Sequence, residues 1–277
     1  MKRDMRSIVP RCVRGLLLLC VALPLLVACA ATRPDPAPRI VLVHGAWMGA
    51  WAWDGVVREL ARAGFDAVAV ELPAHGDDPT PPEAASLDAY VDAVLRALPA
   101  DGRVVLVGHS MGGIVISAVA ERAPERIARL VYVAGYLPRS GESLYALSQT
   151  DTESEVGRHW RQDDPARYSP ASIDAAGRVA VFCADCGADA AARLVARHRP
   201  EPVPPLATPV ALSDERFGRV PRVYLGTRAD RAVGPALQQR MVAAAPGTVL
   251  EWLEGGHAPM LAQPQRLAQR IVAHASP

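Results

Sequence analysis

Residues 104–119, VVLVGHSMGGIVISAV, join a run of β-branched residues to an apolar helix-like stretch through the glycine-containing sequence GHSMGG. Ser110 lies at this junction, between Gly108 and Gly112. When a Gly-x-Ser-x-Gly pattern stands between a strand and a helix, its glycines permit a strained turn that raises the serine hydroxyl above the sheet. The stretch therefore predicts that Ser110 is a nucleophile. The alternative is a structural serine in a tight turn.

A serine hydroxyl needs a base and an orienting acid before it can act as a nucleophile at neutral pH. His257 follows the last strand-like stretch, after a glycine pair, and is the predicted base. Asp230 follows the preceding strand-like stretch and is the predicted acid, whereas Asp214 and Glu215 come before that stretch. The alternatives are an ordinary surface aspartate and a capping or surface histidine. The order serine, aspartate, histidine favours a hydrolytic triad.

Catalysis by a serine also requires donors for the oxyanion, and backbone N–H groups usually provide them. The residue after the nucleophile, Met111, is the first predicted donor. The second is Ala46, in the loop after the first strand-like stretch, where the sequence His-Gly brings the backbone close. Trp47 follows it and is a possible residue of the pocket mouth. A plain β-turn is the alternative for this loop.

The chain has 277 residues, half of them apolar, and a formal net charge of +1. A chain of this length and composition can bury a large core. The arginines are scattered rather than gathered in one patch. We therefore expect no nucleic-acid partner, because binding phosphates requires a clustered excess of cations.

Short apolar runs alternate with helix-like stretches along most of the chain, which predicts an α/β fold. Such runs are typical of parallel strands that are covered on both faces. We expect a mainly parallel sheet of about six strands, built from two parts of the chain, 39–136 and 221–277. Residues 137–220 are polar and rich in proline, and a loop of that length is improbable. They are predicted to form a helical cap insertion. The strand-like runs are 39–44, 65–72, 103–108, 129–135, 222–227 and 248–253.

The N-terminal sequence is typical of an export signal. Basic residues come first, and an apolar run follows that is too short for a confident membrane-spanning helix. Its end, Leu-Val-Ala-Cys, resembles a bacterial lipobox, which implies cleavage after residue 28 and lipidation of Cys29. We therefore expect a signal peptide over 1–28, a tether over 29–38, and an exported lipoprotein attached to a membrane. The alternatives are a plain secreted protein and an uncleaved anchor.

Two cysteines, Cys183 and Cys186, remain outside this N-terminal segment. Export permits a disulfide between them, and the sequence leaves a disulfide and two free thiols as alternatives. No second pair of cysteines or nearby histidine completes a zinc-binding pattern. We therefore expect no metal site.

Several motifs together resemble one family. They are VLVHGAWMGAWAW, ELPAHGDD, LVGHSMGG, DRAVGPALQQRM and GGHAPMLAQP. These stretches are similar to the esterase and hydroxynitrile-lyase group of α/β-hydrolases, which includes plant methylesterases and bacterial carboxylesterases. The resemblance covers most of the chain from about residue 39. It implies the α/β-hydrolase fold with a helical cap, and no metal or organic cofactor.

That group contains two chemistries, and two positions distinguish them. The similar lyases carry a threonine where this chain has Gly45 and a lysine where it has Ala258. Without that lysine, no cation would stabilise a departing cyanide. We therefore expect a serine hydrolase that cleaves a small to medium hydrophobic carboxylic ester through an acyl-enzyme. The alternatives are a hydroxynitrile lyase or another triad enzyme of this fold, and a non-catalytic ligand-binding protein.

Overall fold

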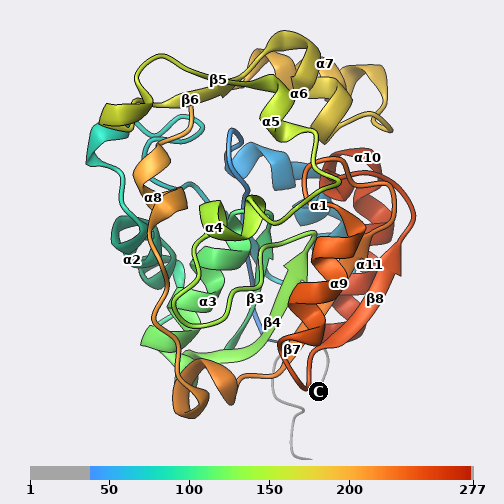
Figure 1. Cartoon of the computed structure of the whole chain (residues 1–277). Helices are drawn as coiled ribbons and strands as arrows, with labels where there is room; N and C mark the ends of the chain where they lie inside the picture. Colours follow the sequence, from blue (N-terminus) through green and yellow to red (C-terminus); the bar gives the residue numbers. More distant parts are fainter. Residues whose placement is uncertain (1–37, 276–277) are drawn as a thin grey trace, which may run out of the picture. The chain divides into compact units, whose positions relative to one another are not determined.

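The computed structural model describes residues 38–275. A six-stranded sheet with the order β2-β1-β3-β4-β7-β8 forms its centre, and every neighbouring pair is parallel (Figure 1). Every residue of β1 and β3 is buried, as expected for apolar strands covered on both faces. The predicted α/β architecture is confirmed. The strands are β1 (Ile40–Val43), β2 (Ala67–Val70), β3 (Val104–His109), β4 (Ile127–Val133), β7 (Arg222–Thr227) and β8 (Val249–Leu253).

Helices flank this sheet, and α1 packs against α11 while α2 packs against α3. The second helix shows why these segments fold as they do. The Ser86 hydroxyl accepts the N–H of Ala89 and caps α2, and apolar residues at helical spacing form its buried face. The helices of the core are α1 (Asp54–Arg62), α2 (Leu87–Ala97), α3 (Gly112–Arg122), α9 (Pro235–Ala243), α10 (Pro259–Ala262) and α11 (Pro264–Ala275), with short helical turns at Ala50–Trp53, Pro82–Ala84 and Pro124–Arg126.

The segment between β4 and β7 forms the insertion. Most of its regular elements are helical, but it also contains a two-stranded antiparallel sheet, β5 with β6, that the sequence does not reveal. Each of these strands has three residues, which is too short for an alternating pattern to emerge. The elements are α4 (Leu144–Ser148), α5 (Val156–His159), β5 (Trp160–Gln162), Pro165–Arg167, β6 (Ala171–Ile173), α6 (Ala175–Phe182), α7 (Ala188–Ala196), α8 (Val203–Ala207) and Asp214–Gly218.

Side chains of the insertion and of the sheet meet in one pocket. Ser110 directly follows the carboxyl end of β3, and it lines this pocket together with Trp160 and Phe182 of the insertion. In Figure 1, β5, β6 and α5–α7 gather at one end of the molecule, beyond the central strands. The insertion therefore covers the carboxyl edge of the sheet, where ligands bind in open α/β sheets.

The predictions for the N-terminus concern residues that the structure does not describe. The signal peptide over 1–28, Cys29 and all but the last residue of the tether over 29–38 lie outside residues 38–275. Within the described range, no helix combines the length and the apolar character needed to cross a bilayer.

Candidate active site

Ser110 occupies a strained turn between β3 and α3. Its φ angle is 52°, in the left-handed region that residues other than glycine rarely adopt. The Ser110 N–H donates to the carbonyl of Val133 at 3.3 Å, and the Ser110 carbonyl accepts the N–H groups of Gly113 and Tyr136 at 2.9 and 3.0 Å. These bonds hold the turn from both sides. Strain of this kind is typical of functional sites.

Glycines make the turn possible because the backbone segments approach too closely for a side chain. A Cβ atom on Gly108 would lie 2.5 Å from the carbonyl oxygen of Gly112, and one on Gly112 would lie 2.7 Å from that of Val43. A Cβ atom on Gly45, in the loop after β1, would lie 2.8 Å from Ser110 Cβ. The loop after β1 therefore packs directly against Ser110.

Asp230 and His257 form a buried pair. The Nδ1 atom of His257 lies 2.9 Å from Asp230 Oδ2. The other carboxylate oxygen of Asp230 accepts the N–H groups of Ala232 and Val233, both at 2.8 Å, and the Thr227 hydroxyl donates to Oδ2 at 2.8 Å. These bonds fix the carboxylate. A proton on Nδ1, donated to this carboxylate, leaves Nε2 of His257 free to accept a proton.

His109, the residue before Ser110, connects the nucleophile turn to the histidine loop. Its Nε2 atom lies 2.9 Å from the His257 carbonyl oxygen, and the centroids of the two rings are 4.6 Å apart. A carbonyl only accepts, so Nε2 of His109 carries the proton. Burial and the neighbouring His257 lower the pKa of His109 well below its usual range, so the ring is neutral. Sequence reasoning missed this contact because the Gly-x-Ser-x-Gly pattern leaves the second position unspecified.

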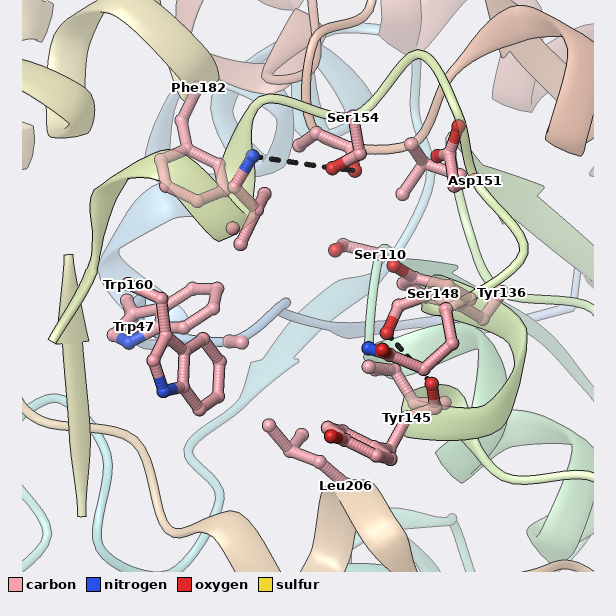
Figure 2. A pocket seen from close by; sticks show the side chains of 17 residues that line it. Trp47, Ser110, Tyr136, Tyr145, Ser148, Asp151, Ser154, Trp160, Phe182 and Leu206 are labelled. Carbon is pink, nitrogen blue, oxygen red and sulfur yellow. Dashed lines mark hydrogen bonds between the residues drawn. The ribbon is translucent and has the colours of Figure 1, made fainter. Parts of the chain in front are cut away.

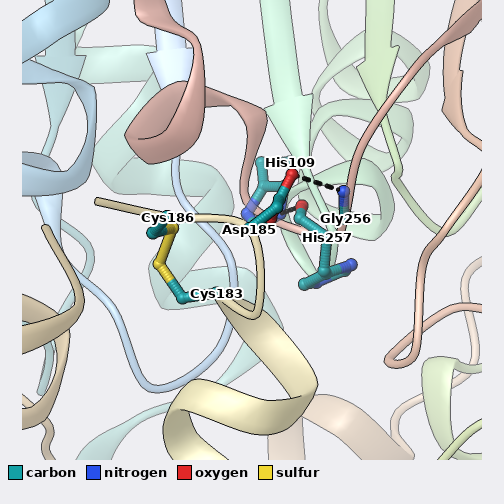
Figure 3. Close-up of a disulfide and its surroundings, with 6 residues drawn as sticks. All are labelled: His109, Cys183, Asp185, Cys186, Gly256 and His257. Atoms are coloured by element: carbon teal, nitrogen blue, oxygen red, sulfur yellow. Dashed lines mark hydrogen bonds between the residues drawn. A yellow bond between two sulfur atoms is a disulfide. The ribbon is translucent and has the colours of Figure 1, made fainter. Parts of the chain in front are cut away.

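A disulfide in the insertion supports the same histidine loop. Cys183 and Cys186 are bonded, which was one of the two alternatives that the sequence left open. Between them, Asp185 accepts the N–H of Gly256 at 2.8 Å, one residue before His257 (Figure 3). The insertion therefore anchors the segment that carries the predicted base.

The predicted oxyanion donors flank Ser110. Ala46 lines the same pocket as Ser110, and Met111 is the buried residue that follows it. Among the hydrogen bonds within residues 38–275, none uses the N–H of Ala46 or of Met111. Both groups therefore remain available to a ligand oxygen.

The His44 ring shapes the loop that carries Ala46. Its Nδ1–H donates to the Gly45 carbonyl at 2.9 Å, and its Nε2 atom accepts the Leu72 N–H at 3.3 Å. This arrangement requires a neutral ring. Burial, together with the nearby His75, lowers the pKa of His44 to about 3.

The pocket above Ser110 has a volume of about 430 Å³. Figure 2 shows the Ser110 hydroxyl facing its interior. Trp47 forms part of the wall. Its ring meets the Trp160 ring edge-on, with the two centroids 5.8 Å apart, and its centroid lies 5.5 Å from that of the Phe182 ring. Other lining residues include Tyr136, Tyr145 and Leu206. Within the part of the chain that the structure describes, no three histidine, cysteine or acidic side chains are grouped closely enough to hold a metal ion.

The structure thus brings the predicted residues into two groups. Ser110, Ala46 and Trp47 line one pocket, and Asp230 is hydrogen-bonded to His257. His109 joins the two groups through its contact with the His257 backbone.

The sequence matches the alpha/beta hydrolase family over residues 40–270, and the chain belongs to this family. Methylesterase 7 of Arabidopsis thaliana is 31% identical over 246 residues, which cover 84% of this chain and 95% of that protein. Methylesterase 1 of the same plant is 30% identical over 253 residues, which cover 83% of this chain and 93% of that protein. The resemblance to the esterase group is therefore confirmed, and the chain is a hydrolase of the carboxylesterase type.

Solved structures of esterases and hydrolases share the fold. Polyneuridine aldehyde esterase superposes with a TM-score of 0.77 at 25% identity, covering 86% of this chain and 99% of that one. A pyrethroid hydrolase from Sphingobium faniae JZ-2 gives a TM-score of 0.73 at 25% identity, covering 86% and 97%.

The neutral state of buried His109 predicts a loss of stability in acid. Because the folded protein lowers the pKa of His109, this contribution to stability is complete above the unfolded pKa of about 6.5 and is lost as the pH falls below it. His109→Gln retains a donor for the His257 carbonyl but does not titrate. We expect the free energy of unfolding, measured with urea at pH 7.5 and 5.5, to fall less in this variant than in the wild type. An equal fall in both proteins would contradict the assignment.

Proposed function

We propose that this protein hydrolyses small to medium hydrophobic carboxylic esters through an acyl-enzyme on Ser110. The observation that carries the proposal is the buried hydrogen bond between His257 and Asp230, at 2.9 Å, next to a strained turn that presents Ser110 to a pocket. A nucleophile, a base oriented by an acid, and free backbone donors are the parts that acyl transfer requires.

The proposed reaction has two stages. Nε2 of His257 takes the proton of Ser110 as the hydroxyl oxygen bonds to the ester carbonyl carbon, and Asp230 stabilises the resulting imidazolium. The N–H groups of Ala46 and Met111 bind the oxyanion. The imidazolium returns its proton to the departing alcohol. Water, deprotonated by His257, then attacks the acyl-enzyme and releases the acid.

The residues beside the histidines favour hydrolysis over cyanohydrin cleavage. Ala258 follows His257 and is fully buried, so no cationic side chain stands at that position. Gly45 follows His44 and packs against the turn of Ser110, where a threonine would clash. Both positions therefore lack the groups that distinguish the similar lyases.

The pocket supports the size and character of the substrate. Its volume of about 430 Å³ lies toward the lower end of the usual range for ligand pockets, about 300–1,000 Å³. Trp47, Trp160, Phe182 and Leu206 give it apolar walls. The names of its relatives, methylesterase and pyrethroid hydrolase, also support an ester substrate.

Replacing the nucleophile tests the proposal. Ser110→Ala should lower kcat by a factor on the order of 10⁴–10⁶, because the acyl-enzyme cannot form. We would follow p-nitrophenol release from acetate, butyrate, octanoate and palmitate esters, and expect the shorter chains to be preferred. Ser86→Ala, remote from the pocket at the start of α2, is the matched control and should retain activity. Near-normal turnover by Ser110→Ala would refute the mechanism.

We further propose that the mature protein carries lipid on Cys29, within the lipobox-like sequence Leu-Val-Ala-Cys. Palmitate labelling in a bacterial host should mark the wild-type protein and not Cys29→Ser, because only a thiol can be diacylated by this route. Equal labelling of both proteins would contradict lipidation at this position.

A further inference from the structure

Glu201 is a carboxylate of the insertion that the proposed mechanism does not use. It lies between α7 and α8, and its exposed fraction is 0%. One of its oxygens, Oε2, lies 2.8 Å from the backbone nitrogen of Trp47 and 2.8 Å from Nε2 of His75. The Trp47 N–H therefore donates to a carboxylate of the insertion.

The Trp47 N–H belongs to the peptide that follows Ala46, one of the proposed oxyanion donors. The φ angle of Trp47 is 59°, in the left-handed region, so this peptide is held in a strained orientation. Fixing the Ala46–Trp47 peptide restricts the backbone on one side of Ala46. The His44–Gly45 contact restricts it on the other side. The Ala46 N–H belongs to the peptide whose carbonyl His44 holds, and Glu201 holds the peptide that follows it.

The insertion also holds the side chain of Trp47. Its indole N–H donates to the carbonyl of Ala171 in β6 at 3.0 Å. Ala171 and Glu201 exchange backbone hydrogen bonds of 2.9 and 2.7 Å as an isolated antiparallel bridge. Trp47, Ala171 and Glu201 thus form a closed ring of hydrogen bonds, which we call the Trp47 latch. These bonds tie the insertion to the loop that carries Ala46.

The two carboxylate oxygens of Glu201 differ in their hydrogen bonding, and a purely stabilising role does not explain the difference. Its second oxygen, Oε1, is buried and accepts no hydrogen bond from the described residues. Leaving a buried polar atom unpaired is unfavourable, and burying a charge is more so. His75 offsets part of this cost. Burial opposes its protonation, but the Glu201 carboxylate, the Pro73 carbonyl and Glu71 together raise the pKa of His75.

We propose that Glu201 is a positioning residue for ester hydrolysis, which holds the Ala46 N–H in the oxyanion hole through the Trp47 latch. This inference rests on the proposed function. It assigns to the insertion a part in stabilising the transition state, besides covering the pocket. The loop after β1 is correctly shaped for the oxyanion only when the insertion is seated on it.

The test is Glu201→Gln, assayed with p-nitrophenyl butyrate. The amide cannot reproduce the anion that binds both the Trp47 N–H and His75. We expect kcat to fall about 10- to 100-fold, since small misplacements of an oxyanion donor have effects of this size. KM should change less than about threefold, because the oxyanion forms only after substrate has bound.

A pair of inhibitors distinguishes a misplaced oxyanion donor from a general disturbance of the pocket. Ser110 adds to an alkyl trifluoromethyl ketone: the C=O double bond becomes a C–O⁻ bond, a bond forms from Oγ to carbon, and His257 takes the proton. This adduct uses the oxyanion hole, and the corresponding trifluoromethyl alcohol does not. Glu201→Gln should weaken binding of the ketone by the same factor by which it lowers kcat/KM, and it should leave binding of the alcohol unchanged. Equal weakening of both inhibitors would overturn the proposal.

Glu121→Gln is the matched control. Like Glu201, Glu121 at the end of α3 accepts a backbone N–H on a side-chain oxygen, here from Ser213 at 2.9 Å and Phe217 at 3.1 Å, but it does not line the pocket. Its kcat should equal that of the wild type. If Glu201→Gln fails to fold, Glu201→Asp keeps the charge for His75 but shortens the reach to Trp47, and its kcat should also fall.

The two hypotheses fail in different ways. If the wild type turns over esters and Ser110→Ala does not, the proposed function is supported, independently of the results for the Glu201 variants. With that result in hand, a folded Glu201 variant with wild-type kcat and wild-type affinity for the trifluoromethyl ketone would overturn the role of Glu201 alone.

Discussion

The close approach of the backbone around Ser110 is the constraint on which the site depends. The Gly108 and Gly112 segments and the loop carrying Gly45 meet with no room for a Cβ atom. This packing forces Ser110 to a φ of 52° and places it against the loop that bears Ala46. Because the carboxyl ends of parallel strands meet at one edge of the sheet, the nucleophile and its proposed donors are neighbours despite their separation in sequence.

The insertion supports both halves of this site with carboxylate acceptors. Asp185, inside the Cys183–Cys186 disulfide, holds the backbone just before His257. Glu201 holds the backbone just after Ala46. Neither carboxylate reacts with substrate in the proposed mechanism. The insertion therefore covers the pocket and also holds the two loops that carry His257 and Ala46.

The strength of the sequence signal differed between parts of the molecule, for physical reasons. The six strands were predictable because they follow local patterns, and so was the placement of Ser110, Asp230 and His257 just after the ends of three of them. Glu201 was not predictable: its partner Trp47 is 154 residues away in the chain, and no local pattern marks either residue. The contact of His109 with His257 spans 148 residues. The β5–β6 pair escaped prediction because each strand has three residues.

The central claim is that Ser110 is activated by its surroundings, and covalent labelling tests it most directly. Folded protein would be treated with a fluorophosphonate, digested and mapped by mass spectrometry. We predict a single adduct on the peptide containing Ser110, and its loss when the protein is unfolded first, since only the folded site supplies His257 and the oxyanion donors. No adduct on folded protein, or one on a different serine, would contradict the activation of Ser110.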